Sequence, residues 1–313
     1  FVQHENFIVS ASMDGQIIVL NKDSGRHKWD PVLLRVEEKN ENRRAVYGTP
    51  VIDNGIIIVG SYDGKLHALS IDDGKLMETE PVTEEFVAGP VYHKGVIYIG
   101  GSDGIMYAYR VKKVSEDVVS FELEWERDLG SKIWSTAGVY QDILIFGSLD
   151  HNVYGLDVNN GDTIWMYETG GAIASSPLVE GSTAYIGSFD STFYAINADG
   201  TLRFKVSAKK DIMTSPSFLT LNESQYIFFG ANDSLIYAVD ENIDLRRCQG
   251  LRNCLRGKQC LSHHLWCEVS DQIRGFLSTR NLQQVIDDYN TNEKVSNKNC
   301  EKPDTVREAL TIN

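Results

Sequence analysis

The chain has 313 residues, of which 42% are hydrophobic, and its formal net charge is −14. This apolar content is sufficient for a packed core, so the composition excludes a globally disordered chain. The charge is uneven: residues 245–313 carry 11 Lys and Arg against 8 Asp and Glu, and the first 244 residues carry 19 against 36. Because so acidic a surface repels phosphate backbones, we expect no nucleic-acid binding by the N-terminal part.

Targeting signals are missing from the printed sequence. No run of 18 or more apolar residues is present, so we expect no transmembrane span. The chain starts at Phe1 without a signal peptide, and we expect a mature piece whose signal or anchor segment is absent from this chain.

One sequence unit recurs along the first 244 residues, most clearly at residues 56–75. An apolar run, Ile56–Gly60, precedes the turn residues Asp63-Gly64, and a second run, Leu66–Ser70, precedes a turn with Gly74. This pattern predicts a β-hairpin followed by a turn into another strand. The acidic turn residue recurs at intervals of 40 to 49 residues, at Asp14, Asp63, Asp103, Asp150, Asp190 and Asp233. Repeats of about forty residues with several short strands each are typical of β-propellers.

Each repeat divides into four strands, A to D, which predicts an all-β propeller of about six to seven four-stranded blades. Strand A starts with small residues or proline, as in Ser176-Pro177, which suits a crowded innermost strand. Strand B is an apolar run, as at residues 96–99, which suits a strand covered on both faces. We assign the propeller to residues 1–244. Residues 245–313 form a Cys-containing segment, partly helical or a closing blade, and residues 30–46 and 111–119 are predicted surface insertions.

The repeat resembles that of the PQQ-like (pyrroloquinoline-quinone-type) propellers. The fourth copy shows its motifs best, in Gly147-Ser148-Leu149-Asp150, Tyr154-Gly155-Leu156-Asp157 and Gly161-Asp162-Thr163-Ile164-Trp165. Quinoprotein dehydrogenases of this family carry adjacent cysteines and a calcium-bound quinone, whereas no two cysteines are adjacent here. The resemblance therefore favours the non-enzymatic members, such as the lipoprotein of the bacterial outer-membrane protein assembly machine.

Blade geometry predicts a binding face. In such blades the D–A and B–C connections lie on one face, which brings the turn acids together with the residues just before strand A: Tyr47, Val87, Trp134, Ala174 and Met213. Aromatic residues on a rim are favoured anchors in interfaces. We predict that a partner contacts Trp134, Tyr47, Met213, Asp63, Asp103 and Asp150. The simpler interpretation of the acids is that each caps its own turn.

Other residues carry weaker expectations. Trp29 and Trp165 each follow a glycine by four residues in the outer strand, and we expect them to pack between blades. The histidines His27, His67, His93 and His151 are scattered and show no ligand spacing, and nothing indicates a Ser–His–Asp triad. Asn222 and Asn232 begin glycosylation sequons.

All five cysteines lie late in the chain, at Cys248, Cys254, Cys260, Cys267 and Cys300. Zinc sites usually carry a close C-x2–4-C pair, and none is present, so no metal is expected. Disulfides among these cysteines are expected if the chain is exported, and free thiols are the other case. Residues 278–289 combine a helix N-cap with apolar residues at helical spacing, which predicts a helix.

Together these observations favour a non-catalytic propeller without a cofactor. It would present a protein or peptide partner with its D–A/B–C face, outside the cytoplasm (periplasmic, secreted or luminal). Two alternatives stay open: a PQQ-dependent oxidoreductase with calcium, or a degenerate relative, and an extracytoplasmic sensor domain that dimerises through an outer blade edge. The sequence leaves the oligomeric state open.

Overall fold

The computed structural model describes residues 1–34, 45–83, 85–221, 224–240 and 310–311. In these residues 24 strands form six four-stranded sheets. The chain divides into two compact units. The first comprises Phe1–Ser217 with Phe229–Ser234, and the second comprises Phe218–Phe228 with Leu235–Asn313. The expected all-β propeller of four-stranded blades is confirmed.

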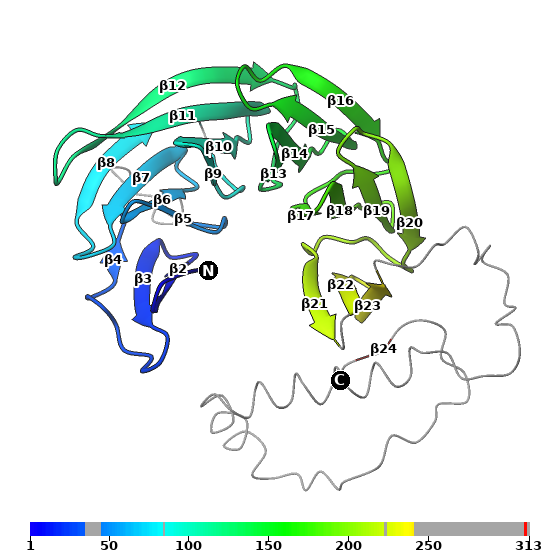
Figure 1. Ribbon diagram of the computed structural model, residues 1–313, viewed down its shortest axis with the longest axis horizontal. Coiled ribbons are helices and arrows are strands. Elements are labelled where there is room, and N and C mark those ends of the chain that lie inside the picture. Colours follow the sequence, from blue (N-terminus) through cyan, green and yellow to red (C-terminus); the bar gives the residue numbers. More distant parts are fainter. Residues whose placement is uncertain (35–44, 84, 222–223, 241–309, 312–313) are drawn as a thin grey trace, which may run out of the picture. The chain divides into compact units, whose positions relative to one another are not determined.

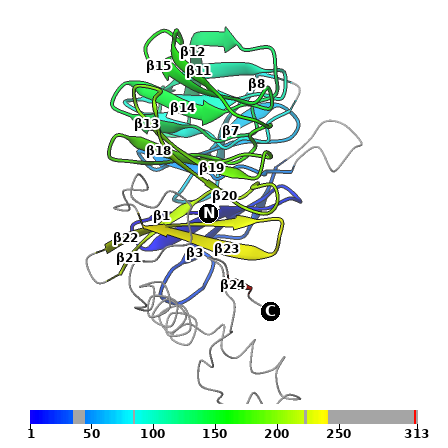
Figure 2. The same ribbon diagram turned by 90° about the vertical axis from the view of Figure 1, so that its right-hand side faces the viewer.

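The first unit contains five sheets, which we call the first to fifth blades. They follow one another in an arc with their first strands innermost (Figure 1), and Figure 2 shows the same sheets from the side, in successive layers. In chain order their strands are β1 Val2–His4, β2 Phe7–Ala11, β3 Gln16–Asn21, β4 Val32–Leu33; β5 Val51–Asp53, β6 Ile56–Gly60, β7 Lys65–Ser70, β8 Leu76–Pro81; β9 Val91–His93, β10 Val96–Gly100, β11 Ile105–Lys113, β12 Val119–Asp128; β13 Gly138–Tyr140, β14 Ile143–Gly147, β15 Asn152–Asp157, β16 Thr163–Glu168; and β17 Leu178–Glu180, β18 Thr183–Gly187, β19 Thr192–Asn197, β20 Leu202–Ser207.

The second strand of a blade is its buried centre. All five residues of β6, β10 and β18 are buried, as the continuous apolar runs predict. In four blades the register between the third and fourth strands shifts at the same place, as in a β-bulge. The shift follows Ala68, Ala108, Gly155 and Ala195. Such bulges bend and twist the outer strand.

Each D–A loop of the first unit is held by two backbone hydrogen bonds to neighbouring blades. In the loop before the fifth blade, the Ala172 carbonyl accepts from Phe189 N–H at 2.9 Å. The next residue, Ile173, donates its N–H to the Ser148 carbonyl of the fourth blade at 3.1 Å. The loop thereby ties the B–C turns of two successive blades. The same pair of bonds is made by the loop pairs Ala45-Val46, Glu85-Phe86, Lys132-Ile133 and Asp211-Ile212.

The second residue of each pair is also a buried apolar plug. Phe86, Ile133, Ile173 and Ile212 are fully buried. They fit because the second strand of the blade ends in glycine. A Cβ on Gly147 would lie 2.1 Å from the Cγ2 atom of Ile173, closer than two carbon atoms can approach. Glycine at this position therefore makes room for the plug.

Hydroxyl groups at the start of the innermost strands join successive blades. Gly89 N–H donates to Thr136 Oγ1 at 2.7 Å, Thr136 N–H to Ser176 Oγ at 2.9 Å, and Ser176 N–H to Ser215 Oγ at 3.0 Å. Thr136 and Ser176 each belong to the blade after that of their donor, and Ser215 lies in the loop that follows the fifth blade. This series explains the Ser and Thr residues at the start of strand A.

Tryptophan side chains connect neighbouring blades, as expected. Trp29 Nε1 donates to the Ile71 carbonyl at 3.0 Å, and Trp165 Nε1 to the Ala198 carbonyl at 2.8 Å. The Trp165 ring packs on Gly200, whose φ of +84° places it in the left-handed region that glycine adopts without strain. The prediction of inter-blade packing for Trp29 and Trp165 is confirmed.

The third-blade insertion at residues 111–119 lies at the surface, as predicted, with residues 112–118 exposed. Residues 111–113 lengthen β11 and residue 119 begins β12, so that a long hairpin projects beyond the other blades (Figure 1). Cross-strand ion pairs follow this extension, with Lys112 bonding Glu122 at 2.5 Å and Arg110 bonding Glu124. Opposite charges on the paired strands thus support the continuation of the sheet into this insertion. Most of the other insertion, residues 35–44, lies outside the described residues.

The sixth sheet has the strand order β21 Ser217–Leu221, β22 Ser224–Ala231, β23 Leu235–Asp240 and β24 Leu310–Thr311. Most of it belongs to the second unit. Its last strand comes from the end of the chain, where Leu310 pairs with Ile236 and Thr311 with Leu235.

Because Ile173 fills the space beside Gly147, substitutions at these two positions should have coupled effects on the free energy of unfolding. Gly147→Ala should lower the free energy of unfolding by about 1–3 kcal/mol because the new methyl group collides with Ile173. Ile173→Ala should cost about 2–5 kcal/mol through the cavity it leaves. Urea denaturation of both single variants and the double variant measures the coupling. The double variant should lose clearly less than the sum, and strict additivity would mean that the two residues do not compete for one space.

Candidate functional site

The candidate site is the rim of the D–A loops in the first unit. The residue after each buried plug lies at the same loop position, and this position carries Tyr47, Val87, Trp134, Ala174 and Met213. Tyr47 and Met213 are 47% and 48% exposed, and Trp134 is half-buried. The buried plug anchors the loop backbone next to each of these residues, so their side chains are carried by loops that are held in place.

Trp134 has the most defined surroundings of the rim residues. Its indole Nε1 donates to Ser102 Oγ at 3.3 Å, which links the D–A loop to the B–C turn of the preceding blade. The Lys132 ammonium lies 5.9 Å from the centre of the indole ring, within reach of a cation–π contact. The loop and turn predicted to share a face therefore do so here, and they orient the tryptophan.

Tyr47 and Met213 are held more loosely. Tyr47 packs edge-to-face on Tyr62 of the neighbouring B–C turn, with ring centres 5.5 Å apart. Met213 has its Sδ atom 3.5 Å from Asn232 Nδ2. Asn232, which begins a sequon, also donates to Asp211 Oδ2 at 2.6 Å. Both rim residues thus contact a B–C turn and still expose about half of their surface.

The turn acids accept hydrogen bonds from their own turns. Asp103 accepts from Ile105 N–H at 3.0 Å and from the Tyr107 hydroxyl at 2.5 Å. Asp150 accepts from Tyr154 at 2.6 Å, and Asp190 is bonded by its own tyrosine in the same way. The pattern is an aspartate followed four residues later by a tyrosine, and it fixes the turn under the rim. A binding role for these acids stays a prediction.

These contacts raise the tyrosine pKa values. Burial, followed by the hydrogen bond to Asp190, raises the pKa of Tyr194 to about 12. Burial and the bond to the turn acid raise the pKa of Tyr107 and of Tyr154 in the same direction. Both effects favour the neutral phenol, because a phenolate beside a carboxylate in a partly buried site is unfavourable.

The second blade departs from this pattern, because His67 takes the place of the tyrosine. His67 is 2% exposed, its Nε2 lies 3.0 Å from Ser61 Oγ, and its Nδ1 lies 3.1 Å from Thr79 Oγ1. Asp63 accepts a short hydrogen bond from Ser61. Burial raises the pKa of Asp63, but the nearby His67 side chain, the hydrogen bond from Ser61 and the charge of Lys65 outweigh burial and lower that pKa overall.

This serine, histidine and aspartate do not form a hydrolytic triad. A triad needs the acid on the imidazole nitrogen that faces away from the serine. Here Asp63 lies 3.9 Å from Nε2, the nitrogen that faces Ser61, and Thr79 takes the other nitrogen. Ser61 is also fully buried. The cluster therefore fixes the turn and does not expose a nucleophile.

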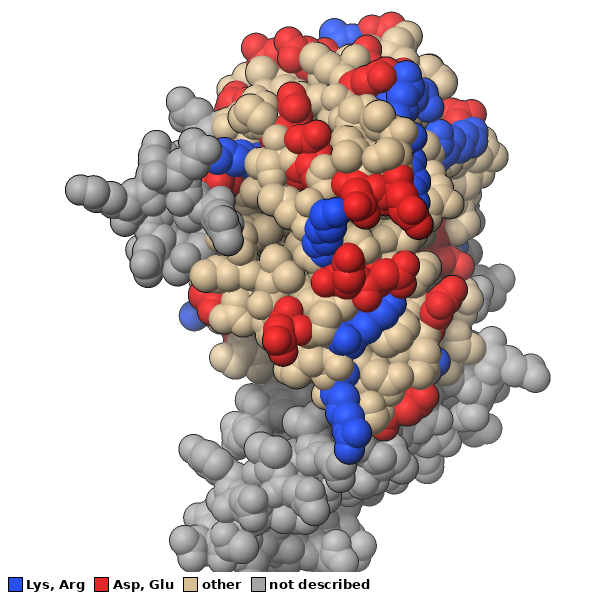
Figure 3. Space-filling view, turned by 90° about the vertical axis from the view of Figure 1, so that its left-hand side faces the viewer, with Lys and Arg blue, Asp and Glu red and all other residues tan. Residues whose placement is uncertain are grey.

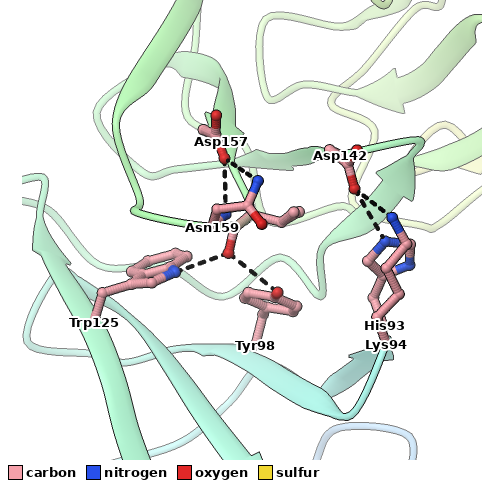
Figure 4. A network of polar contacts seen from close by, with 8 residues as sticks. His93, Lys94, Tyr98, Trp125, Asp142, Asp157 and Asn159 are labelled. Carbon is pink, nitrogen blue, oxygen red and sulfur yellow. Dashed lines mark hydrogen bonds and ion pairs between the residues drawn. The ribbon is translucent and has the colours of Figure 1, made fainter.

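A cavity of about 220 Å³ lies at the seam between the third and fourth blades, beside their A–B and C–D turns (Figure 4). Tyr98 and Trp125 both donate to the Val158 carbonyl, at 3.1 and 2.9 Å. At its mouth Asp142 accepts from Lys94 at 2.6 Å, and this contact is the main cause that lowers the pKa of Asp142. The cavity is large enough for a few water molecules.

His93 Nε2 is buried at this seam without a hydrogen-bond partner in the described part of the chain. Asp142 lies 3.7 Å from it, beyond hydrogen-bond distance. A bound water at this nitrogen would complete its bonding. The polar contacts of the seam otherwise act between blades, and they brace the packing of the third blade on the fourth.

Several predicted features lie outside the described residues. They are the five cysteines, the helix expected at 278–289 and the sequon at Asn222. Within the described ranges no group of three His, Cys, Asp or Glu side chains could hold a metal ion. Those ranges also contain no helix with the length and apolar character of a membrane span.

Comparison with known proteins supports a PQQ-like repeat in part of the chain. Residues 115–242 match the family model described as outer membrane protein assembly factor BamB. The crystal structure of BamB from Moraxella catarrhalis superposes with a TM-score of 0.57 at 18% identity, over 75% of this chain and 70% of that one. At this identity the superposition supports the propeller fold alone.

A different class of protein also matches. The regulator IscR of Photorhabdus laumondii, an HTH-type transcriptional regulator, is 48% identical over 52 residues, or 17% of this chain. A putative HTH-type transcriptional regulator of Azotobacter vinelandii matches equally well. The chain spans 32% of the length of both relatives, so the activity of the whole regulators does not carry over to it.

The Asp–Tyr pair predicts a pH-dependent stability difference. Tyr194→Phe should lower the free energy of unfolding at pH 7 by about 1.5–3 kcal/mol, because the Asp190 carboxylate loses a donor. The raised pKa of Tyr194 stabilises the fold below pH 10, the ordinary value of tyrosine, and this stabilisation is lost as the pH rises toward about 12. Urea denaturation should therefore show a smaller wild-type advantage at pH 11 than at pH 7. An equal advantage at both values would contradict the assignment.

Proposed function

We propose that this chain is a non-catalytic scaffold that binds a protein partner through its D–A/B–C face. Its place would be the assembly of outer-membrane proteins, outside the cytoplasm. The observation that carries the proposal is the match of residues 115–242 to the family of an outer-membrane protein assembly factor, on a propeller whose rim side chains are exposed.

The rim meets the physical requirements of an interface. Binding is tighter when the contact groups are already held in place, because less conformational freedom is lost. The double backbone bonds and the buried plugs hold the D–A loops, and the hydrogen bond to Ser102 orients Trp134. Tryptophan and tyrosine are the side chains most enriched among interface hot spots. Trp134 is therefore the proposed anchor, and Tyr47 and Met213 extend the surface.

The turn acids have a supporting role in this proposal. Asp63, Asp103 and Asp150 give their oxygens to internal hydrogen bonds, which keep the B–C turns beside the rim in one conformation. Acidic side chains at this face favour a partner with basic groups around an apolar contact. The partner would thus pack on the aromatic anchors, and the acids would orient its approach.

The partner contact can be tested with the chain in the cells that produce it. A photo-crosslinking amino acid at position 134 or 47 should yield an adduct with one outer-membrane assembly protein. The same amino acid in place of Leu202, on an outer strand away from the rim, should not. Trp134→Ala should then weaken binding of the crosslinked protein by about tenfold or more.

A matched control variant separates loss of the partner contact from a general effect of changing the loop. Val87→Ala changes the same loop position in the preceding D–A loop and should leave the affinity nearly unchanged. The free energy of unfolding of Trp134→Ala should fall by no more than about 1 kcal/mol. Unchanged affinity of this variant would remove Trp134 from the site. Saturable binding of the quinone with calcium, with reduction of a dye, would replace the scaffold function with an oxidoreductase.

A further inference from the structure

The outermost strand of every blade has one unpaired edge, and proteins normally protect such edges from pairing with other chains. The usual protections are short strands, charged side chains and proline. In the first unit, four of the five outer strands have at least one of these protections. Figure 3 shows the side of β8 and β12, over which acidic and basic side chains are interspersed. β4 is protected by its length of only two residues. The other three strands carry charged residues or proline: Glu78, Glu80 and Pro81 in β8; Glu122, Glu124 and Glu126 in β12; and Arg203 and Lys205 in β20.

The outer strand of the fourth blade, β16, is the exception. Its sequence Thr-Ile-Trp-Met-Tyr-Glu has a single charge, at its last residue. Threonine, isoleucine and the aromatic residues favour extended strands. Ile164 and Met166 are 52% and 57% exposed. Among the strands that the structure describes, β16 is hydrogen-bonded to β15 alone, so its outer edge is unpaired by any of them.

Comparison of the third, fourth and fifth blades at one register position sets β16 apart from its two neighbours. Met166 pairs with Tyr154 as Glu126 pairs with Tyr107 and Lys205 with Tyr194. The outward position is thus acidic in the third blade, apolar in the fourth and basic in the fifth. The fourth blade lacks the charge that its neighbours use for protection.

The two faces of β16 point to different blades. Trp165 and Tyr167 face the fifth blade, where Trp165 bonds the Ala198 carbonyl and Tyr167 packs edge-to-face on Tyr194. Because side chains alternate along a strand, Met166 faces the other way, toward the third blade. Ile164 is the extra residue of the irregularity after Gly155, and its side chain is exposed. Lys205 is the register equivalent of Met166, so it faces back toward the fourth blade, and it is exposed.

We propose that β16 is a docking edge for an extended segment of a partner protein, in which apolar and acidic side chains alternate. The segment pairs with β16 through its backbone as a fifth strand of the blade. Its apolar side chains cover Ile164 and Met166, and its acidic side chains lie on the face toward Lys205. This edge lies on the circumference and not on the D–A/B–C rim, so it is independent of the proposed function.

A second copy of this chain fits the edge less well. Antiparallel pairing of two β16 strands requires a two-fold axis normal to the sheet. That axis would bring β12 of one copy beside β12 of the other. Glu122, Glu124 and Glu126 would then approach the same acids, and like charges at short distance are unfavourable. An acidic and apolar strand from another protein avoids this repulsion.

The test uses the full chain and a capped, fluorescently labelled peptide in which valine alternates with glutamate. Fluorescence anisotropy should show saturable binding. Met166→Lys should weaken it by about tenfold, or ~1.4 kcal/mol. The matched control Leu202→Lys places the same charge on the neighbouring outer strand, at a position that is also exposed, and should leave affinity within about twofold.

Two further peptides keep the test independent of any variant's folding. A valine–glutamate peptide with N-methyl groups on alternate amides cannot pair as a strand and should not bind the unaltered chain. A valine–lysine peptide should bind several-fold more weakly. Equal binding of the N-methylated peptide, equal affinity for Met166→Lys, or no binding of the first peptide at millimolar concentration would overturn the proposal. Self-association abolished by Met166→Lys, without peptide binding, would assign the edge to a second copy instead.

Discussion

The first unit depends on one repeated interaction, the pair of backbone hydrogen bonds that each D–A loop makes to the B–C turns on either side of it. A carbonyl bonds forward to the next blade, and the adjacent N–H bonds back to the blade before. A four-stranded sheet alone cannot bury both of its faces, so blades are stable only when packed on neighbours. The loop pair fixes the order and spacing of neighbouring blades at the level of the backbone. Side chains that differ from blade to blade can therefore share one geometry.

The plug and the glycine complete this arrangement. A fully buried side chain such as Ile173 follows the carbonyl of the loop and enters the space left by Gly147. The residue after the plug must then point away from the core, and this is the position of Tyr47, Trp134 and Met213. The same constraint that stabilises the unit thus creates the rim, so a side chain there can vary without disturbing the packing beneath it. This separation of packing from recognition suits a scaffold.

The sequence predicted the architecture well because the strand pattern repeats. The period of the acidic turns predicted the number and order of the repeats, and the apolar runs predicted the second strands. The glycine four residues before Trp165 indicated a contact between blades. The backbone bonds of the D–A loops could not be predicted, since hydrogen bonds of irregular loops leave no side-chain pattern. The plug did leave a signal: an apolar residue two positions before a small residue in each loop, as at Ile173 and Ser175.

Other features of the molecule become visible only when the strand register of the blades is known. The insertion at residues 111–119 was predicted to lie at the surface, but its strand extension, in which Lys112 and Glu122 pair across strands, was not predicted. His67 in the tyrosine position and the unprotected β16 become visible only when equivalent residues of the blades are compared. The structure therefore adds the alignment of the repeats, and the candidate rim retains the residues that the sequence proposed.

Amide hydrogen exchange of the native chain tests the central claim most directly. If the D–A loops are held by their paired backbone bonds, the N–H groups of Ile133, Ile173 and Leu149 should exchange as slowly as those in the buried strand β14, near the limit of global unfolding. The exposed turn at Gln141 serves as the fast reference within the same blade. Exchange of the three loop and turn amides at the rate of that reference would show that the loops open freely, and would contradict the account.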